Sequence, residues 1–339
     1  MLKYFSGAVA LFAAAHVGAV SIDFGPATGF NIFVKENFNQ PGADSQGRIA
    51  VGGNAFIGQY DVGVNYEPNT WRDGIQFWTE PGKYSDVLVV GGNLSTAQWA
   101  WGNVKGNVIL GGELTAGSSK NAVLGSTIKG TPIDFNSAFD QFSQLSQALA
   151  QQENTGGLEF KYNNWLILGG ESENNVYFTT ITGQMLGSAT DLTAKGLDAN
   201  DTLVINVSGK HVQFDSLNYG RRESFAALET PANNILYNFF EAETITFSGG
   251  IKGNILAPNA DFTFLQGDLS GQVIAKSWTG GWGAQANLWD GFFTPVDLTP
   301  PPLAPVTTPP AVEVKESSTL ALLLGGLIAL ILVRRRRHH

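Results

Sequence analysis

The stretch Arg48-Ile49-Ala50-Val51-Gly52-Gly53-Asn54 is the clearest structural signal in this chain, because its pattern returns further along. A short apolar run, which favours a β-strand, ends at a glycine pair, which favours a tight turn. The copies are spaced irregularly, so the pattern predicts many short strands rather than a clean repeat array. The other copies are Val87-Leu88-Val89-Val90-Gly91-Gly92-Asn93, Val108-Ile109-Leu110-Gly111-Gly112 and Trp165-Leu166-Ile167-Leu168-Gly169-Gly170, and further strands are expected at 202–207, 244–247 and 253–257.

The composition around these runs favours a packed, mainly β domain. The 339 residues include 41 glycines and 22 phenylalanines, whereas charged residues make up only 14%, the opposite of the balance in disordered chains. Short strands can stack turn upon turn into a β-helix, a solenoid that buries a continuous apolar column while alternate side chains point outward. We expect the glycines to adopt left-handed backbone at the corners, where Asn is also tolerated. A β-sandwich is the alternative fold.

One long amphipathic α-helix interrupts the strands. Asp134 can cap its start, and apolar residues recur every three or four positions up to Gln152. The glycines at 156–157 would end it. Its apolar stripe needs a partner, and the side of the solenoid is the expected one. The stripe consists of Phe135, Phe139, Phe142, Leu145 and Leu149.

Residues 1–19 have the features of a signal peptide. Lys3 provides the positive start, residues 4–15 form the apolar region, and Val17 and Ala19 place small residues where signal peptidase recognises its substrate. The protein is therefore expected to be secreted through the inner membrane.

The C-terminal residues 317–339 have the features of a sorting signal with a transmembrane helix. The apolar run 320–333 has 14 residues, about 21 Å of helix, which is short for a bilayer core of about 30 Å. The arginines that follow act as a stop-transfer signal that stays in the cytoplasm. A plain tail anchor is the alternative to a tail that a membrane protease removes. A proline-rich linker, 298–316, would join this tail to the folded domain, 20–297, and the stop-transfer residues are Arg334, Arg335, Arg336 and Arg337.

Charge and cysteine content exclude several function classes. The chain has no cysteine, which excludes a disulfide framework, a cysteine nucleophile and a thiolate metal site. Without the two terminal segments, 15 basic and 29 acidic residues remain, a net charge of −14. A domain this acidic repels nucleic acid, so no nucleic-acid partner is expected.

Catalytic and metal-binding patterns are weak, and we expect no enzyme and no cofactor. Only one histidine, His211, lies in the expected folded domain. It is more simply interpreted as an ordinary strand residue than as a member of a catalytic triad. The many carboxylates form no recognisable pair for glycoside hydrolysis. Calcium is the one ion that an acidic turn such as Asp198-Ala199-Asn200-Asp201 could hold, although neither an EF-hand nor a phosphate-binding loop is present.

Aromatic and threonine side chains are the candidates for surface recognition. Exposed tryptophans stack on sugar rings, but the segment 278–282 would equally suit a cap at the end of the solenoid. Two threonine pairs, 180/182 and 244/246, would each face one side of a strand, as in ice-binding surfaces, although two pairs do not make an array. The candidate ligand-stacking residues are Trp99, Trp101, Trp278 and Trp282.

The tail resembles the PEP-CTERM sorting signal of Gram-negative bacteria. Lys315 and Ser317 stand where that signal has its two prolines. The resemblance implies processing by an exosortase-type protease and delivery to the cell surface or extracellular matrix, with transient anchoring in the membrane. The residues that form the sorting motif are Val314, Glu316, Ser318, Thr319 and Leu320, and Ala321, Leu322 and Leu323 also match.

The domain itself resembles the choice-of-anchor A family of bacterial surface proteins over about residues 22–293. The family implies a right-handed β-helix with an adjacent helix and an adhesive role. The segments that carry the resemblance are Phe30-Asn31-Ile32-Phe33-Val34, Gly47 to Asn54, Gly250-Ile251-Lys252-Gly253-Asn254-Ile255-Leu256-Ala257-Pro258-Asn259-Ala260 and Leu269-Ser270-Gly271-Gln272-Val273-Ile274-Ala275.

These observations together predict a non-catalytic adhesin or a structural protein of a biofilm or exopolysaccharide matrix. Its expected partners are a polysaccharide or extracellular-matrix ligand, the processing protease, and the membrane through the C-terminal tail. A carbohydrate-active β-helix enzyme and an ice-binding solenoid are the alternatives.

Overall fold

A computed structural model describes the folded part of the chain with several gaps. The described residues are 20–64, 86–97, 104–115, 123, 125–162, 164–170, 175–195, 197, 200–217, 232–288 and 291–298. Residues 1–299 form one compact unit and residues 300–339 a second. The expected signal peptide, sorting motif and stop-transfer arginines therefore lie outside the described residues.

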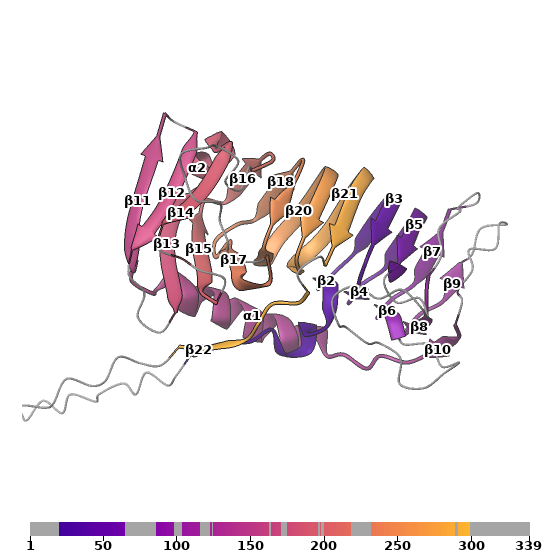
Figure 1. Ribbon diagram of the computed structural model, residues 1–339. Coiled ribbons are helices and arrows are strands. Elements are labelled where there is room, and N and C mark those ends of the chain that lie inside the picture. Colours follow the sequence, from indigo (N-terminus) through magenta and orange to yellow (C-terminus); the bar gives the residue numbers. More distant parts are fainter. Residues whose placement is uncertain are drawn as a thin grey trace, which may run out of the picture. The chain divides into compact units, whose positions relative to one another are not determined.

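The chain is mainly β, built around one curled sheet of 17 strands in which every pairing is parallel (Figure 1). Parallel pairing throughout this sheet excludes the expected alternative of an antiparallel β-sandwich. The strands are β2 (Phe30–Val34), β3 (Phe38–Ser45), β4 (Arg48–Val51), β5 (Ala55–Val62), β6 (Asp86–Val90), β7 (Leu94–Thr96), β8 (Asn107–Leu110), β9 (Leu114–Thr115), β10 (Thr127–Lys129), β13 (Val176–Thr182), β15 (Thr202–Ser208), β16 (His211–Phe214), β17 (Ile235–Asn238), β18 (Thr244–Phe247), β19 (Ile251–Lys252), β20 (Asn254–Ser270) and β21 (Val273–Asn287).

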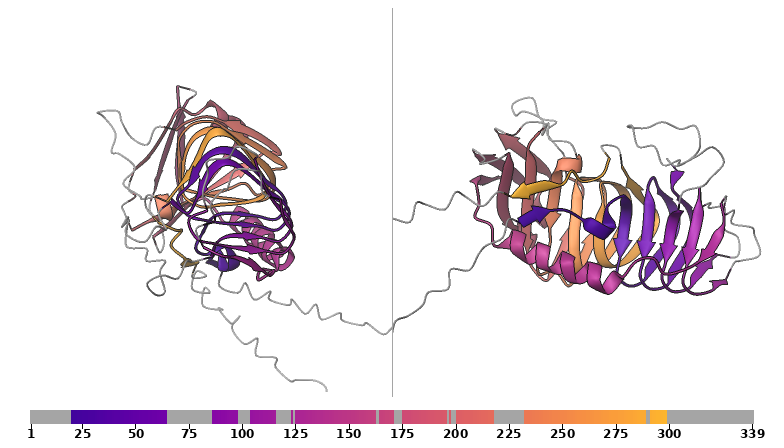
Figure 2. Two further views of the ribbon diagram at one scale, coloured as in Figure 1. Left: turned by 90° about the vertical axis from the view of Figure 1, so that its right-hand side faces the viewer. Right: turned by 90° about the horizontal axis from the view of Figure 1, so that it is seen from below.

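The first strand of this sheet lies in its middle rather than at an end. β2 pairs with β4 on one side and with β21 on the other, although β21 follows it by about 240 residues. The chain runs from β2 outward through β4, β6, β8 and β10. It then crosses to the opposite end and returns through β13, β15, β17, β20 and β21. The view along the coil in Figure 2 shows these turns nested one behind another.

Alternation along each strand places apolar side chains inside the coil. One inward column runs in register from β15 to β10, and all of its members except the last are buried. The opposite column of the same strands points toward a helix instead. The inward column is Ile205, Tyr237, Ile255, Val273, Ile32, Ile49, Leu88, Val108 and finally Thr127.

Helix α1 (Phe135–Ala150) runs along the outside of the coil (Figure 2). Asp134 caps it as expected, because its carboxylate accepts a hydrogen bond from the Ser137 amide at 3.1 Å. Phe139 and Phe142 are buried, and their rings lie 5.9 and 5.7 Å from that of Phe33 on β2. The expected amphipathic helix packed alongside the strands is therefore confirmed; it ends at Ala150 rather than Gln152.

Buried amides fix the second half of this helix. Asn238 on β17 accepts a hydrogen bond from the Ser146 hydroxyl at 2.6 Å and donates one to the Ser146 carbonyl at 2.8 Å. It also donates to Asn206 on β15, whose own amide donates to the Leu149 carbonyl at 2.9 Å. These amides use their donors and acceptors within the protein, which offsets the cost of burying them.

The glycine pairs are required by close approach and not by left-handed backbone. A Cβ on Gly91 would lie 2.5 Å from the Gly52 carbonyl oxygen of the adjacent turn, and one on Gly111 only 2.2 Å from that of Gly91. None of these three has a positive φ. The Asn after the pair has its own role, because the Asn54 side chain accepts a hydrogen bond from the Asn93 amide at 2.8 Å. The expected conformation was therefore wrong for these pairs, although it holds at Gly253 and Gly271, which have φ of 128° and 147°.

The Trp165 copy of the motif does not join the stacked turns. It forms β12 (Trp165–Gly170), which pairs antiparallel with β11 (Gly156–Lys161) and parallel with β14 (Asp191–Lys195) in a separate sheet. The apolar residues Leu166, Leu168 and Leu192 of this sheet join the interior of the coil beside β13. Smaller elements are β1 (Val20–Ile22), paired antiparallel with β22 (Val296–Leu298), α2 (Gly183–Ser188), η1 (Gly25–Ala27) and η3 (Ala232–Asn234).

The finer parts of the expected fold class stay predictions. The curled parallel sheet and its flanking helix agree with the expectation of a solenoid, whereas the right-handed sense of a β-helix stays a prediction. Among the described helices, none is long and apolar enough to cross a membrane. The expected transmembrane helix falls in 317–339, outside the described residues.

Candidate functional site

A set of strands next to the helix-covered ones presents polar side chains outward. In β18, β20 and β21 the sequence alternates, and Ile245, Phe262 and Trp278 point inward and are buried. The residues between them point away from the core. Among the described residues, neither α1 nor α2 covers these outward positions (Figure 1): Thr279 is exposed, and Thr246 and Thr263 are partly exposed.

One outward row continues in register across eight strands. Its centre is Thr246, Thr263 and Thr279, contributed by β18, β20 and β21. Neighbouring strands lie about 4.8 Å apart, so the three threonines repeat at that interval. We call the whole set the hydroxyl row: Gln213, Thr246, Thr263, Thr279, Asn39, Phe56, Ser95 and Thr115.

The hydroxyl row carries no charged side chain, and two ion pairs lie beside it. Asp261 accepts hydrogen bonds from Lys276 at 3.1 Å and from Ser277 at 2.7 Å. Lys210 contacts Glu243 at 2.6 Å, which raises the pKa of the lysine and lowers the pKa of the glutamate. Apart from the partly exposed ring of Phe56, a partner would therefore meet neutral hydroxyl and amide groups that can both donate and accept hydrogen bonds.

Sequence reasoning found only part of this row. It identified Thr244 and Thr246 but missed Thr263 and Thr279, because the partner strands are not evenly spaced in the chain. The available signal was the alternation in Asp261-Phe262-Thr263-Phe264 and Ser277-Trp278-Thr279-Gly280. Thr180 belongs to a different face, since it pairs with Asn206 beside α1, and Thr182 caps α2 by accepting from the Met185 amide at 3.1 Å.

The four tryptophan candidates have different positions. Trp278 is only 1% exposed and its Nε1 donates to Gln40 at 2.7 Å, so it cannot stack on a ligand. Trp282 is 68% exposed. Trp99 and Trp101 lie outside the described residues. The expected role of 278–282 as an end cap is wrong, because β21 lies between β20 and β3 in the middle of the sheet.

The expected catalytic and metal-binding candidates form no cluster in the described part of the chain. His211 starts β16 at an exposed outward position and lies 3.0 Å from the Thr244 hydroxyl, an ordinary strand contact. No three histidine, aspartate or glutamate side chains among the described residues could hold a metal ion together. Asp198 of the acidic turn lies outside those residues.

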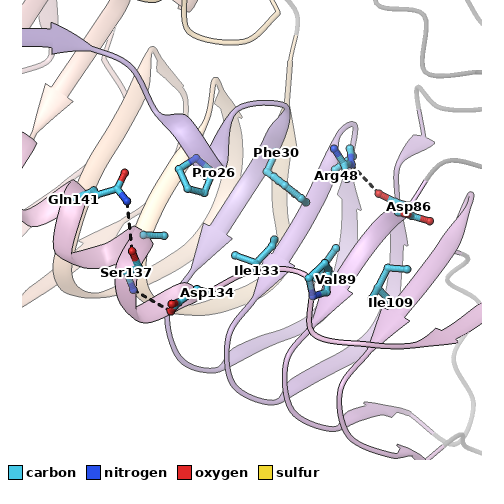
Figure 3. A pocket seen from close by; sticks show the side chains of 12 residues that line it. Pro26, Phe30, Arg48, Asp86, Val89, Ile109, Ile133, Asp134, Ser137 and Gln141 are labelled. Carbon is cyan, nitrogen blue, oxygen red and sulfur yellow. Dashed lines mark hydrogen bonds between the residues drawn. The ribbon is translucent and has the colours of Figure 1, made fainter.

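A shallow pocket of about 430 Å³ lies near the start of α1 (Figure 3). Val89, Ile109 and Ile133 line it with apolar surface. The polar groups at its rim are already engaged. The Arg48 guanidinium lies 4.2 Å from the centre of the Phe30 ring, and its Nε donates to the Asp86 carbonyl at 2.7 Å. Asp134 caps the helix. This arrangement favours a structural role for the rim rather than chemistry.

Comparison with family models identifies the domain. Residues 23–286 match the family described as "Putative Ice-binding-like adhesive domain". The chain belongs to this family. The match spans nearly all of the curled sheet, α1 and the whole hydroxyl row, so the ice-binding-like adhesive domain is the folded body of the protein. The family is adhesive or ice-binding-like in kind, and no catalytic cluster occurs among the residues that the structure describes.

Solved structures similar to this ice-binding-like adhesive domain share little sequence with it. An ice-binding protein from an Antarctic biological consortium has a TM-score of 0.37 and 14% identity, with 87% of this chain and 97% of that chain covered. One from the Antarctic ascomycete Antarctomyces psychrotrophicus also has a TM-score of 0.37 and 14% identity, covering 83% and 100%. Ice-binding protein 1 of Shewanella frigidimarina has a TM-score of 0.34 and 15% identity, covering 78% and 98%. No curated protein matches. These TM-scores lie below 0.5, so nothing about function follows from them.

Proposed function

We propose that this protein is a non-catalytic adhesin or matrix protein of a bacterial surface, and that the hydroxyl row contacts its polysaccharide or extracellular-matrix ligand. The observation that carries the proposal is the register of Thr246, Thr263 and Thr279 on three neighbouring strands. A rigid parallel sheet holds these groups at a fixed spacing, so a repeating polymer can meet several of them at once. Each contact is weak, and many copies of the protein on one surface would add avidity.

The substitution Thr263→Lys tests this proposal in the full chain. A long cation in the centre of the hydroxyl row would hold a ligand away from its neighbours, so we expect adhesion to exopolysaccharide or matrix-protein coatings to fall about tenfold, as for the loss of one or two contacts. Thr180→Lys is the matched control, because Thr180 is also an outward strand threonine, exposed where Thr263 is partly exposed, but lies beside α1. Equal adhesion of the two variants would remove the hydroxyl row from the mechanism. Release of soluble sugar by the wild type would favour the carbohydrate-active alternative.

Ice binding is the second candidate function, favoured by the same regular spacing of uncharged threonine side chains. It predicts that the full chain inhibits ice recrystallisation and that Thr263→Lys loses this activity while Thr180→Lys keeps it. An inactive wild type would leave adhesion to polymers as the function of the row.

We further propose a surface location reached through the two termini. In this proposal residues 1–19 direct secretion, the segment 317–339 holds the protein briefly in the inner membrane of a Gram-negative bacterium, and an exosortase-type protease removes it. The PEP-CTERM-like residues of the tail and the choice-of-anchor A-like segments of the domain support this route. Intact-mass measurement of the protein from cells tests it: the mature form should lack Arg334 to Arg337, and a retained tail would contradict it.

A further inference from the structure

Two exposed apolar side chains lie together at the corner that follows the hydroxyl row. Trp282 on β21 is 68% exposed and Leu265 on β20 is 49% exposed. They occupy neighbouring turns, because Phe264 is in register with Gly280 and Gln266 with Gly283. On the other side, the six-membered ring of Trp282 lies over Gly42 of β3, where an added Cβ would come within 2.6 Å of the ring. We call Leu265, Trp282 and Gly42 the Trp282 corner.

A buried amide holds this corner in place. The Gln40 side chain is fully buried and donates to the Gly42 carbonyl at 2.6 Å and to the Gly281 carbonyl at 2.9 Å. Its oxygen accepts from the Trp278 indole at 2.7 Å. Gln40 therefore fixes the backbone beneath the exposed indole ring and the residue just before it. A rigid aromatic ring loses little conformational entropy when it binds a partner.

Neutral amides flank the exposed ring on both sides. Gln59 on β5 is in register with Gly42, and Gln266 on β20 with Gly283, and both side chains are exposed. Thr279 and Asn39 of the hydroxyl row are also exposed nearby. An apolar ring face surrounded by amide and hydroxyl groups matches a sugar ring, whose C–H bonds face one way while its hydroxyls point outward.

Nearby carboxylates decide which class of sugar polymer fits. Asp44 and Asp61 are in register two residues beyond Gly42 and Gln59, and Asp268 lies two residues beyond Gln266. Like charges repel, so a polyanion such as a uronic-acid polymer is disfavoured here. We propose that the Trp282 corner binds a neutral polysaccharide, with the Trp282 indole stacked on one sugar ring and Gln59 and Gln266 hydrogen-bonded to its hydroxyls. This rests on the proposed adhesive function and names its ligand class.

Affinity electrophoresis of the full chain tests the proposal. The gels contain hydroxyethylcellulose, a soluble β-1,3-glucan, dextran or galactomannan as neutral polymers, and alginate as the polyanion. We expect the wild type to be retarded by at least one neutral polymer, and Trp282→Ala to bind it about tenfold more weakly, since the stacking contact is lost. Trp282→Tyr should retain most of the binding. Tyr162→Ala is the matched control, because Tyr162 is 82% exposed but lies in the β11–β12 hairpin.

The outcomes separate this inference from the function on which it rests. If Trp282→Ala binds like the wild type while Thr263→Lys does not, the Trp282 corner is not the polysaccharide site, and adhesion through the hydroxyl row stands. Retardation by alginate alone would overturn the neutral ligand class. If the wild type is retarded by none of the five polymers, binding to polysaccharide fails together with this inference. The melting temperatures of the Trp282 and Tyr162 variants should match that of the wild type, because both of these side chains are exposed. A large drop in the melting temperature of Trp282→Ala would assign the ring a structural role instead.

Discussion

At the scale of single residues, the glycine pairs are needed because the adjacent turns leave no room for a Cβ atom. Successive turns approach so closely at Gly52, Gly91 and Gly111 that each faces a carbonyl oxygen of its neighbour. Gly91→Ala should therefore reduce the free energy of unfolding by about 1–3 kcal/mol, because the turns must separate to admit a methyl group. Gly157→Ala is the control, since an added Cβ there would meet nothing within 4 Å. Urea unfolding measures both, and equal stability would contradict the close-approach explanation.

A second residue, Asp44, links stability to pH. Burial raises its pKa above the ordinary value of 3.8, and the carboxylates of Asp61 and Asp268 raise it further. The folded protein thus holds this proton more tightly than the unfolded chain does. The resulting stability is fully present below the unfolded pKa and is lost as the pH rises through the raised folded pKa.

Replacing Asp44 with Asn should remove this pH dependence. We expect Asp44→Asn to melt above the wild type at about pH 7 and to lose its advantage at about pH 3, where the wild-type carboxyl is protonated. Asp140→Asn removes the same charge from an exposed position on α1 and serves as the control. A melting temperature of Asp44→Asn equal to that of the wild type at both pH values would show that the surroundings of Asp44 do not disfavour its charged form.

At the scale of elements, α1 is held by two different kinds of contact. Its first half packs aromatic rings around Phe33, and its second half bonds to the buried amides of β15 and β17. Phe139→Ala should cost about 3–5 kcal/mol, because a buried ring leaves a cavity that the sheet cannot fill. Gln144→Ala, on the exposed side of α1, should cost far less. Thermal unfolding measures both variants. An unchanged melting temperature of Phe139→Ala would mean that the packing of α1 does not stabilise the sheet.

This helix is also the element that the sequence predicts best. Its cap at Asp134 and its apolar spacing are local signals, so they can be read without knowledge of distant partners. The strands at 48–51, 87–90 and 108–110 are likewise found from short apolar runs. By contrast, Trp165–Gly170 has the same local pattern but forms β12 in another sheet, because its neighbours in space decide its role.

The candidate site was harder to predict for the same reason. Thr263 and Thr279 become neighbours only through the register of β20 with β21. The opposite fates of Trp278 and Trp282, four positions apart, follow from a change in strand register at the corner between them. Neither the strand register nor the position of this corner can be predicted from the composition or from the spacing of apolar residues. The position of β2 between β4 and β21 is also invisible in the chain order.

At the scale of the whole molecule, the two ends of the coil differ. Beside β13, the β11–β12–β14 sheet adds apolar residues to the interior. At the opposite end β9, which pairs with β7, and β10, which pairs with β8, are the last strands, and no described strand pairs beyond them. Lys129 on β10 is in register with the inward, buried residues Leu110 and Val90. A charged residue at an inward position of an edge strand opposes pairing with another chain.

Lys129 is therefore expected to keep this end from associating. Its ammonium group contacts Glu113 at 2.8 Å and also donates to the Gly112 carbonyl. Lys129→Leu would replace this polar closure with an apolar edge next to Leu114, which is already 41% exposed. We expect concentration-dependent dimers in sedimentation velocity, formed by two such ends meeting about a two-fold axis. Lys210→Leu removes a similar ion pair, with Glu243, from a turn and should remain monomeric. If Lys129→Leu also remains monomeric, the edge is protected by something other than this lysine.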